Sequence, residues 1–293
     1  MASYSIKDLE KISGIKAHTI RIWEKRYALI QPERSLTNIR YYNDNDLRKI
    51  LNVSILIRNG FKISKISELN DVNIGEKVLI FSQKKSDVAG IIEHLMVAMF
   101  ELDEHKFEHI ISNQILNKGF EETIIKVIYP FFDRLGILWQ AGSVMPAQEH
   151  FVSNIIRQMF IVAIDGLHTT ETIDKKFLLF LPEGEYHELG LLFYSYILKK
   201  RGFKVIYLGQ SVPLENLKLI NNVLNIDYIL FTVNTALNHQ KLEDLKTFLF
   251  LNFECKIFVS GLQSNSFNSN EFTQLVQMKS PEHFLNLITE FCV

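Results

Sequence analysis

The chain reads Phe177-Leu178-Leu179-Phe180-Leu181 and, shortly afterwards, Glu185-Tyr186-His187-Glu188-Leu189-Gly190. An unbroken apolar run followed by a polar loop, and then by a helical stretch that ends at Lys199-Lys200-Arg201, is typical of a buried parallel strand that leads into a crossover helix. The loops that follow such strands line the ligand crevice of an open α/β sheet. We therefore expect this loop to bring an imidazole to a ligand site.

The same alternation continues to the end of the chain. Strands are expected at Phe177–Leu181, Lys204–Leu208, Tyr228–Thr232 and Lys256–Val259, with a weaker fifth near Leu275–Met278. Helices are expected near Leu191–Lys200, Leu214–Leu224, Lys241–Leu251 and Pro281–Phe291. Because each interval holds one crossover helix, residues 176–293 are predicted to form a Rossmann-like, doubly wound parallel sheet. No GxGxxG or Walker loop occurs, which argues against an enzyme of the dinucleotide or ATP class.

The loop after the first predicted strand has the chemistry of a metal site. His187 can ligate a metal, and Glu185 is placed to accept the other ring N–H and so hold the neutral tautomer. Gly190 leaves room for a large flat ligand to approach the backbone.

These residues resemble the E/D-x-H-x-x-G signature of cobalamin-binding domains. The resemblance implies that His187 ligates cobalt from below and that the nucleotide tail of the cofactor enters the sheet past Gly209, Thr232, Ser260 and Gly261. The family often has two glycines where this chain has Ser260-Gly261. The serine side chain could either narrow the channel for the nucleotide tail or donate a hydrogen bond to the tail.

The N-terminal segment is predicted to form a winged helix-turn-helix. Ser5-Ile6-Lys7-Asp8 reads as a capping box, Gly14 ends the first helix, and a second helix runs from about His18 to Lys25. Leu29–Arg34 and Ile39–Tyr42 flank the connection Ser35–Asn38 as the two strands of a wing, and further helices begin near Asp44 and Ser64. On the second helix, Ile20 and Trp23 are expected to face the core.

The segment resembles the DNA-binding domain of the MerR family over about residues 3–71, within a predicted domain of residues 1–75. The resemblance is carried by Thr19-Ile20-Arg21-Ile22-Trp23-Glu24-Lys25-Arg26-Tyr27, Pro32, Arg34, Asn38, Arg40-Tyr41-Tyr42 and Asp46-Leu47. Double-stranded DNA is thus the expected partner. Its phosphates and base edges would be contacted by Thr19, Arg21 and Arg26 from the second helix and by Arg34, Arg40 and Tyr41 from the wing. Residues 1–72 carry a net charge of +5 in a chain of −1, as a nucleic-acid contact would require.

The middle of the chain, residues 80–170, is predicted to be a bundle of three or four helices, with a kink or boundary at Pro130. Its apolar positions recur at helical spacing, for example Phe107, Ile111 and Leu116. Trp139 is followed after nine residues by Glu149-His150. An indole offers a flat apolar surface, and a carboxylate with an imidazole can hydrogen-bond ribose hydroxyls or a purine edge.

This spacing resembles the W-x9-EH motif of light-responsive regulators of the CarH/LitR type. The resemblance implies that the bundle caps the upper face of adenosylcobalamin, with Trp139, Glu149 and His150 at the adenosyl group. In that family a histidine directly after the tryptophan replaces the lost adenosyl group on cobalt. This chain has Gln140 there, so water or His150 would have to take that place.

Composition sets the remaining expectations. Apolar residues make up 47% of the chain, enough for packed cores, and neither a membrane-spanning run nor a secretory leader is recognisable, so a cytoplasmic protein without a membrane partner is expected. The cysteines Cys255 and Cys292 lack the spacing of a zinc site or disulfide framework.

Together these features predict a cobalamin-dependent transcriptional repressor that is not an enzyme. It would form a dimer or tetramer on a DNA operator under the control of adenosylcobalamin and light. One alternative is a MerR-like regulator whose cobalamin fold has degenerated and which answers to a protein regulator. Another is a corrinoid carrier component of an enzyme.

Overall fold

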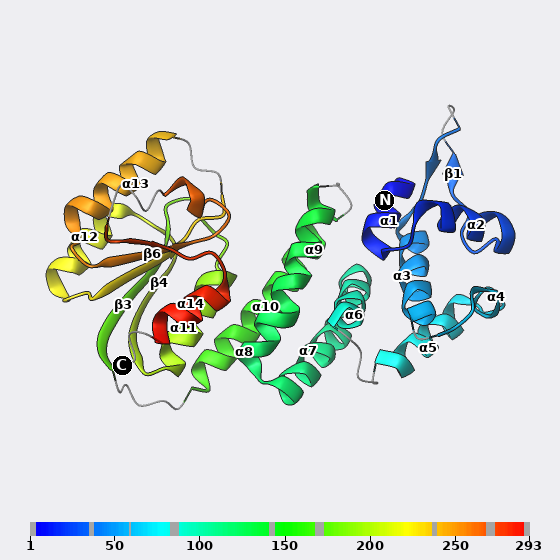
Figure 1. The fold of residues 1–293 in the computed structure, drawn as a ribbon, viewed down its shortest axis with the longest axis horizontal. Coiled ribbons are helices and arrows are strands. Elements are labelled where there is room, and N and C mark those ends of the chain that lie inside the picture. Colours follow the sequence, from blue (N-terminus) through cyan, green and yellow to red (C-terminus); the bar gives the residue numbers. More distant parts are fainter. Residues whose placement is uncertain are drawn as a thin grey trace. The chain divides into compact units, whose positions relative to one another are not determined.

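The computed structural model describes residues 4–34, 38–58, 60–82, 88–140, 144–167, 173–235, 239–267 and 273–289. Its contacts group the chain into two compact units, Met1–Ile155 and Ile156–Val293 (Figure 1). The first unit contains both the predicted winged module and most of the predicted bundle. The division of the chain into three domains, at 1–75, 80–170 and 176–293, remains a prediction. Among the described residues, no helix has the length and apolar character needed to cross a membrane. Part of the predicted wing connection, residues 35–37, and Cys292 lie outside the described residues.

The N-terminal module begins as predicted. The Ser5 side chain accepts a hydrogen bond from the Asp8 backbone while the Asp8 carboxylate accepts one from the Ser5 backbone, which is a capping box. Gly14, at φ 72, ends the helix in the left-handed region. The elements of this module are α1 (Ile6–Ser13), α2 (Ala17–Tyr27), β1 (Glu33–Arg34), β2 (Arg40–Tyr41), α3 (Asp44–Arg58), α4 (Ile63–Ile66) and α5 (Asp71–Ser82).

The wing is shorter than predicted. Leu29 and Ile30 were expected in its first strand, but β1 holds only Glu33 and Arg34, paired antiparallel with β2. The exposed fractions of Leu29 and Ile30 are only 4% and 3%. Successive residues of a strand point to opposite faces, so two neighbouring buried side chains on a two-stranded wing are not compatible with strand geometry. Both residues instead bury into the module as irregular chain.

Two helices of the first unit are surrounded on all sides. Residues 50–56 of α3 are all buried, and so are residues 90–99 of α6 (Val88–Glu101). A helix that is buried all round lies between other elements, and α3 packs against α1, α5 and α6. The N-terminal module and the bundle therefore share a core.

The bundle consists of α6, α7 (Glu104–Lys118), α8 (Phe120–Thr123), the π-helix η1 (Ile124–Ile128), α9 (Tyr129–Gln140) and α10 (Pro146–Asp165). The π-helix directly precedes Tyr129-Pro130. Because proline lacks an N–H and its ring clashes with the carbonyl four residues earlier, a wider turn at this point accommodates it. The predicted irregularity at Pro130 is thus present as a π-helical turn.

The expected core position Leu116 is wrong, since its side chain is 84% exposed. The buried face of α7 carries Phe107 and Ile111, four residues apart. A residue five positions beyond Ile111 is rotated well away from that face, because each residue turns the helix by about 100°.

The second unit contains the predicted parallel sheet. Its strands are β3 (Ile173–Pro182), β4 (Phe203–Val212), β5 (Tyr228–Thr232), β6 (Lys256–Ser260) and β7 (Leu275–Gln277). They lie in the order β4-β3-β5-β6-β7, and all neighbouring pairs are parallel. The chain leaves β3 towards β4 on one side and returns to β5 on the other, so the topological switch point lies between β3 and β5.

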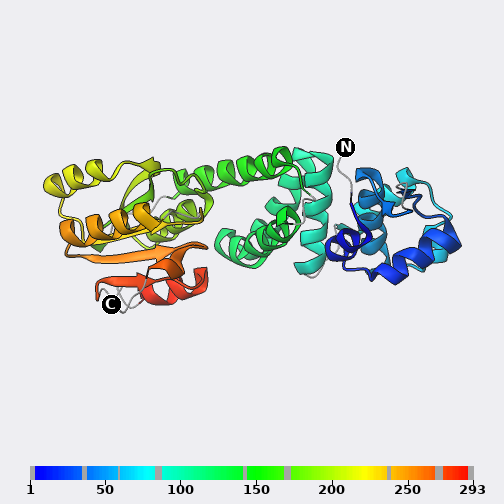
Figure 2. The same ribbon diagram turned by 90° about the horizontal axis from the view of Figure 1, so that it is seen from above.

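Helices cover both faces of this sheet. They are α11 (Leu189–Lys200), α12 (Leu214–Val223), α13 (His239–Asn252) and α14 (Pro281–Thr289). The ring of Tyr194 on α11 contacts Phe284 on α14, while α12 packs against α13. Figures 1 and 2 show these two pairs on opposite sides of the strands, as in a doubly wound fold.

Candidate cofactor site and nucleic-acid interface

Glu185 joins the two loops at the switch point of the sheet. Its side chain is 0% exposed and lies in the loop after β3. One carboxylate oxygen, Oε2, accepts hydrogen bonds from the backbone N–H groups of Asn234 (2.6 Å) and Thr235 (2.7 Å), which follow β5. The other, Oε1, lies 2.6 Å from Nδ1 of His187. The predicted hydrogen bond between Glu185 and His187 is therefore present.

The charge of Glu185 determines which ring nitrogen of His187 donates the hydrogen bond between them. Burial disfavours a charged carboxyl, but the hydrogen bonds from the His187 ring and from the backbone of Thr235, His187 and Asn234 outweigh it and lower the pKa of Glu185 to about 2. An ionised carboxylate can only accept, so Nδ1 of His187 is the donor in this hydrogen bond, and Nε2 is the ring nitrogen that a metal could bind when the imidazole is neutral. The His187 side chain is 65% exposed.

Sequence reasoning missed Glu188, the buried neighbour of His187. Its carboxylate accepts hydrogen bonds from Arg157 Nε (2.8 Å), Tyr207 OH (2.8 Å) and Gln210 Nε2 (3.2 Å). Burial and the Glu188 carboxylate both raise the pKa of Tyr207, and the hydrogen bond to Glu188 raises the pKa of Arg157. These bonds attach the last turns of α10 to the His187 loop and β4. The sequence signal that could have pointed to Glu188 was its place as a second acidic residue between Glu185 and Gly190.

Thr232, a predicted tail-channel residue, lies close to Gly190, which was predicted to leave room for a flat ligand. Thr232 ends β5, is 2% exposed, and its Oγ1 has no hydrogen-bond partner among the described residues. A Cβ added to Gly190 would lie 4.0 Å from the Thr232 methyl group, so Gly190 and Thr232 face each other. A buried hydroxyl without a partner marks a place where a polar ligand group would be stabilised.

The other three residues refine the prediction. The Ser260 hydroxyl lies 2.8 Å from the buried Tyr194 hydroxyl. Gly261, at φ 101, could not carry a side chain, because a Cβ would lie 2.4 Å from the Val233 carbonyl oxygen. Gly209 was expected at the end of a strand but lies inside β4, three residues before its last residue, at φ 80. The strand continues beyond the predicted Leu208 because Val212 still pairs with Pro182.

The predicted upper-face residues lie in the first unit, at the junction of α9 and α10. Trp139 is 48% exposed near the end of α9. In the first turn of α10, His150 Nδ1 lies 3.1 Å from Glu149 Oε2, and Ser153 donates a hydrogen bond to Glu149 Oε1. The side chain of Gln140 and residues 141–143 lie outside the described residues. The half-exposed indole offers a flat apolar surface, and the Glu149–His150 pair offers polar groups.

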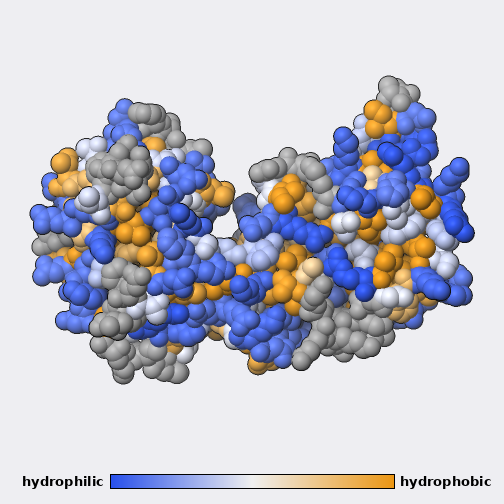
Figure 3. Space-filling view, in the orientation of Figure 1, coloured by the Kyte–Doolittle hydropathy of each residue, from blue (hydrophilic) through white to orange (hydrophobic). Residues whose placement is uncertain are grey.

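The predicted DNA-contacting residues divide into two kinds. Arg21 and Arg26 of α2 are exposed, and hydrophilic side chains cover this end of the first unit in Figure 3. By contrast, Arg40 Nε donates to both oxygens of Glu24 at 3.1 and 3.0 Å, and Arg34 donates to Asn38 at 2.7 Å. Arg40 thus connects the wing to α2 before any phosphate is bound.

Thr19 and Tyr41 complete the predicted DNA surface. The Thr19 hydroxyl lies 3.3 Å from His18 Nε2, and the Tyr41 side chain is 39% exposed on β2. The interior expectations are confirmed, since Ile20 and Trp23 are buried with exposed fractions of 0% and 6%.

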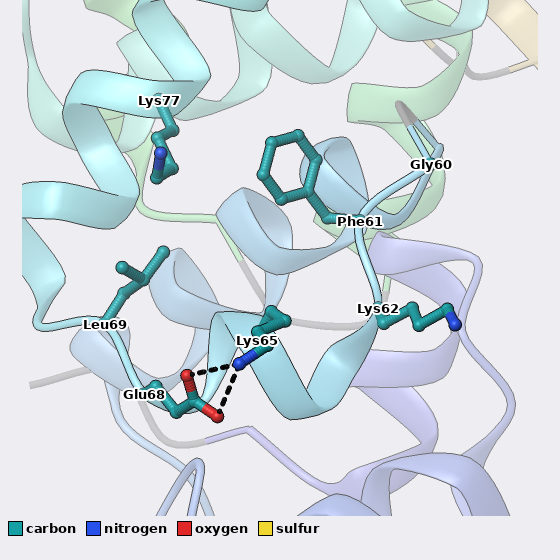
Figure 4. A pocket seen from close by; sticks show the side chains of 7 residues that line it. All are labelled: Gly60, Phe61, Lys62, Lys65, Glu68, Leu69 and Lys77. Carbon is teal, nitrogen blue, oxygen red and sulfur yellow. Dashed lines mark hydrogen bonds and ion pairs between the residues drawn. The ribbon is translucent and has the colours of Figure 1, made fainter.

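A shallow cavity of about 480 Å³ lies between α4 and α5, away from every predicted site residue (Figure 4). The ammonium of Lys77 lies 5.7 Å from the centre of the Phe61 ring, and Lys65 forms an ion pair with Glu68 at 3.1 Å. The side chains around it are Gly60, Phe61, Lys62, Lys65, Glu68, Leu69 and Lys77. The cavity is largely open to solvent and has no group suited to corrin chemistry.

Two family models match the chain. Residues 4–71 match the MerR HTH family regulatory protein model, and residues 91–163 match a B12 binding domain model. The chain thus carries a MerR-type helix-turn-helix domain and a B12-binding domain.

Curated relatives cover most of the chain. The HTH-type transcriptional repressor CarH of Myxococcus xanthus is 26% identical over 259 residues, which is 84% of this chain and 83% of CarH. CarA of the same organism, also an HTH-type transcriptional repressor, is 24% identical over 71% of this chain and 68% of CarA. Among solved structures, the monomethylamine corrinoid protein of Methanosarcina barkeri matches 70% of this chain and 100% of its own, with a TM-score of 0.54 and 14% identity. That likeness supports the fold.

Proposed function

We propose that this chain, which combines a MerR-type DNA-binding domain with a B12-binding domain, is a cobalamin-dependent repressor of transcription. The observation that carries the proposal is the Glu185–His187 pair at the switch point of the sheet. Its geometry prepares one imidazole nitrogen for a metal at the place where open α/β sheets bind ligands. The curated relatives are named as transcriptional regulators, which supports a regulator rather than an enzyme.

The residues of the sheet fit a corrinoid with an extended tail. Thr232 offers a buried hydroxyl without a partner among the described residues, and Gly190 and Gly261 leave the backbone bare nearby. Glu185 would hold the proton on Nδ1 of His187, so that Nε2 is available as the lower ligand of cobalt. The cofactor would supply a cobalt centre and an upper organic group that differs between its forms.

We further propose that the effector form is adenosylcobalamin and that light acts through the upper group. Trp139 would stack on that group, and Glu149 and His150 would hydrogen-bond it. The side chains of Trp139 near the end of α9 and of Met145 just before α10 are 48% and 42% exposed, so a ligand would have apolar surface to cover on both. A change in the upper group would then reach α9 and α10 through these side chains.

On the nucleic-acid side, α2 would enter the major groove with Thr19, Arg21 and Arg26, while Arg34, Arg40 and Tyr41 of the wing would contact phosphates. Glu24 holds Arg40 against α2, so the wing is already oriented. A dimer or tetramer would present several such modules to adjacent half-sites.

The cofactor experiment uses the purified full-length chain with adenosylcobalamin in the dark. We expect a coloured complex whose absorption spectrum, oligomeric state and operator affinity all change on illumination. His187→Ala should lower cofactor retention, whereas His105→Ala, an exposed histidine of α7, should not. A protein that stays colourless after mixing with the cofactor would refute cobalamin binding. A coloured complex whose DNA affinity changes with neither cofactor nor light would refute the regulatory role.

The DNA experiment measures operator affinity against salt concentration. Replacing a phosphate-contacting arginine should lower the slope of log affinity against log salt by about one. Arg21→Ala and Arg40→Ala are compared with Lys118→Ala, an exposed cation at the end of α7. Unchanged slopes for both arginine variants would show that the predicted surface does not contact DNA.

A second candidate is a regulator that has lost the cofactor and answers to a protein partner. The Ser260 hydroxyl, already paired with Tyr194, favours it, because that hydroxyl is one of the groups expected to reach the tail. The colourless outcome of the cofactor experiment, together with retained DNA binding, would support this candidate.

A further inference from the structure

The two parts of the first unit are connected by a buried carboxylate with two cationic neighbours. Glu93 lies on α6 of the bundle and is 0% exposed. Its Oε1 lies 2.7 Å from Arg58, the last residue of α3 in the N-terminal module, and 4.0 Å from Arg134 on α9. We call these three residues the Glu93 cluster.

A second ion pair connects the same two helices further along. Arg48 of α3 lies 3.9 Å from Glu101, the last residue of α6, and Glu101 also pairs with Lys106 at 2.9 Å. Because the lower-numbered arginine pairs with the higher-numbered glutamate, α3 and α6 run antiparallel. The two pairs differ on the carboxylate side, since 1% of the Glu93 side chain is exposed but 25% of the Glu101 side chain, whereas Arg58 and Arg48 are almost equally exposed.

The cluster also includes the helix that carries Trp139. Arg134 and Trp139 are five residues apart on α9, about 7.5 Å along the helix axis. The π-helix η1 and Pro130 lie at the other end of α9, and π-helical turns are frequent at functional sites. In addition, α9 packs directly against α1 of the DNA-binding module. A displacement of α9 would therefore change the distance between Arg134 and Glu93.

Burial of the Glu93 carboxylate is not explained by stability alone. The side chains of Arg58 and Arg134 keep 40% and 22% of their surface exposed, but taking the carboxylate out of water still costs several kcal/mol, and apolar side chains of similar volume often serve stability equally well. A shared carboxylate at unequal distances from two cations has, however, two alternative pairings. Such a two-state element is what coupling between distant sites requires.

We propose that the Glu93 cluster transmits the state of the cofactor site to the DNA-binding module. This inference rests on the proposed function. In the structure described here Glu93 holds Arg58 and keeps the module docked on the bundle. When a ligand covers Trp139 and shifts α9, Arg134 competes for Glu93, the hold on Arg58 weakens, and the module takes the arrangement that binds the operator.

Two variants of the full-length chain should both lower the ratio of operator affinities with and without adenosylcobalamin, one by raising the affinity of the cofactor-free protein and the other by lowering that of the loaded protein. In Arg58→Gln the docking contact is lost, so the cofactor-free protein should bind DNA nearly as tightly as the loaded one. In Arg134→Gln the competitor is lost, so the loaded protein should bind DNA no better than the free one. If the wild-type ratio lies in the ordinary range of roughly 5- to 150-fold, both variants should fall below about threefold.

Arg48→Gln is the matched control, because it removes an arginine of α3 whose partner Glu101 keeps Lys106. Its affinity ratio should stay within about twofold of the wild-type ratio. Cofactor binding, followed by absorbance, should be unchanged in all three variants, and backbone hydrogen exchange at the end of α3 should increase when the wild-type protein is loaded.

The outcomes separate the two proposals. A wild-type protein that binds the cofactor without any change in DNA affinity refutes the proposed function, and this inference with it. A responsive wild-type protein with Arg58→Gln and Arg134→Gln variants that respond equally well refutes only the coupling role. Loss of DNA binding in both variants, with or without cofactor, would show that the cluster is merely structural.

Discussion

Replacing Glu185 with glutamine should destabilise the sheet of the second unit. The substitution keeps the size of the side chain but turns one acceptor oxygen into a donor that faces N–H groups of His187, Asn234 or Thr235. A carboxyl whose pKa falls from 4.5 to about 2 on folding adds about 3 kcal/mol to the free energy of unfolding at neutral pH. Because the folded-state pKa is the lower one, this contribution is present above pH 4.5 and is lost as the pH falls towards 2.

The assay must report on the second unit alone. Both tryptophans, Trp23 and Trp139, belong to the first unit, so intrinsic fluorescence does not follow the sheet. Backbone hydrogen exchange in β3 and β5 does, and about 3 kcal/mol corresponds to roughly a hundredfold faster exchange at pH 7. Glu183→Gln, the same change at an exposed position of the same loop, is the control. Equal exchange rates in Glu185→Gln and Glu183→Gln would refute the reasoning.

Three further predictions concern single positions. Gly261→Ala should lower the free energy of unfolding of the second unit by about 2 kcal/mol more than Gly184→Ala does. Both glycines have positive φ, but only a Cβ at Gly261 would meet a backbone oxygen. Equal melting temperatures of the two variants would contradict this. Burial lowers the pKa of His94 from 6.5 to about 4. The free energy of unfolding should therefore fall by up to about 3 kcal/mol as the pH drops from 6.5 to 4. A His94→Leu variant whose denaturation midpoint shows the same pH dependence as the wild type would contradict this. Ser5→Ala removes the capping box of α1 and should cost about 1 kcal/mol in urea unfolding, with no loss expected for Ser67→Ala on the surface.

The presence of each strand of the second unit could be predicted because its signals are local, although β3 and β4 are ten residues long where shorter strands were predicted. The apolar run at Phe177–Leu181 is bounded by charged and turn residues, and β5 spans Tyr228–Thr232 as expected. The order of the strands is not a local property, since it depends on which side each crossover helix packs. Sequence spacing therefore predicted a parallel sheet but did not place the switch point between β3 and β5.

The site could be predicted only in part, for the same reason. The Glu185–His187 hydrogen bond joins residues two apart, so the motif itself suggested it. The bonds from Asn234 and Thr235 to Glu185, and from Arg157 to Glu188, join residues far apart in the chain. Likewise, Glu93 is an acidic residue in the mostly apolar, buried stretch of α6. Its burial depends on Arg58 and Arg134, which no periodicity connects to it.

The all-round burial of α3 has a practical consequence for anyone who shortens the gene. A fragment that stops after α5 would keep every element of the winged module but would expose the side of α3 that α6 covers in the whole protein. Apolar residues that become exposed to solvent favour self-association, so such a fragment should aggregate or form non-native dimers. DNA-binding studies with a minimal fragment would then measure an assembly that the intact protein never forms.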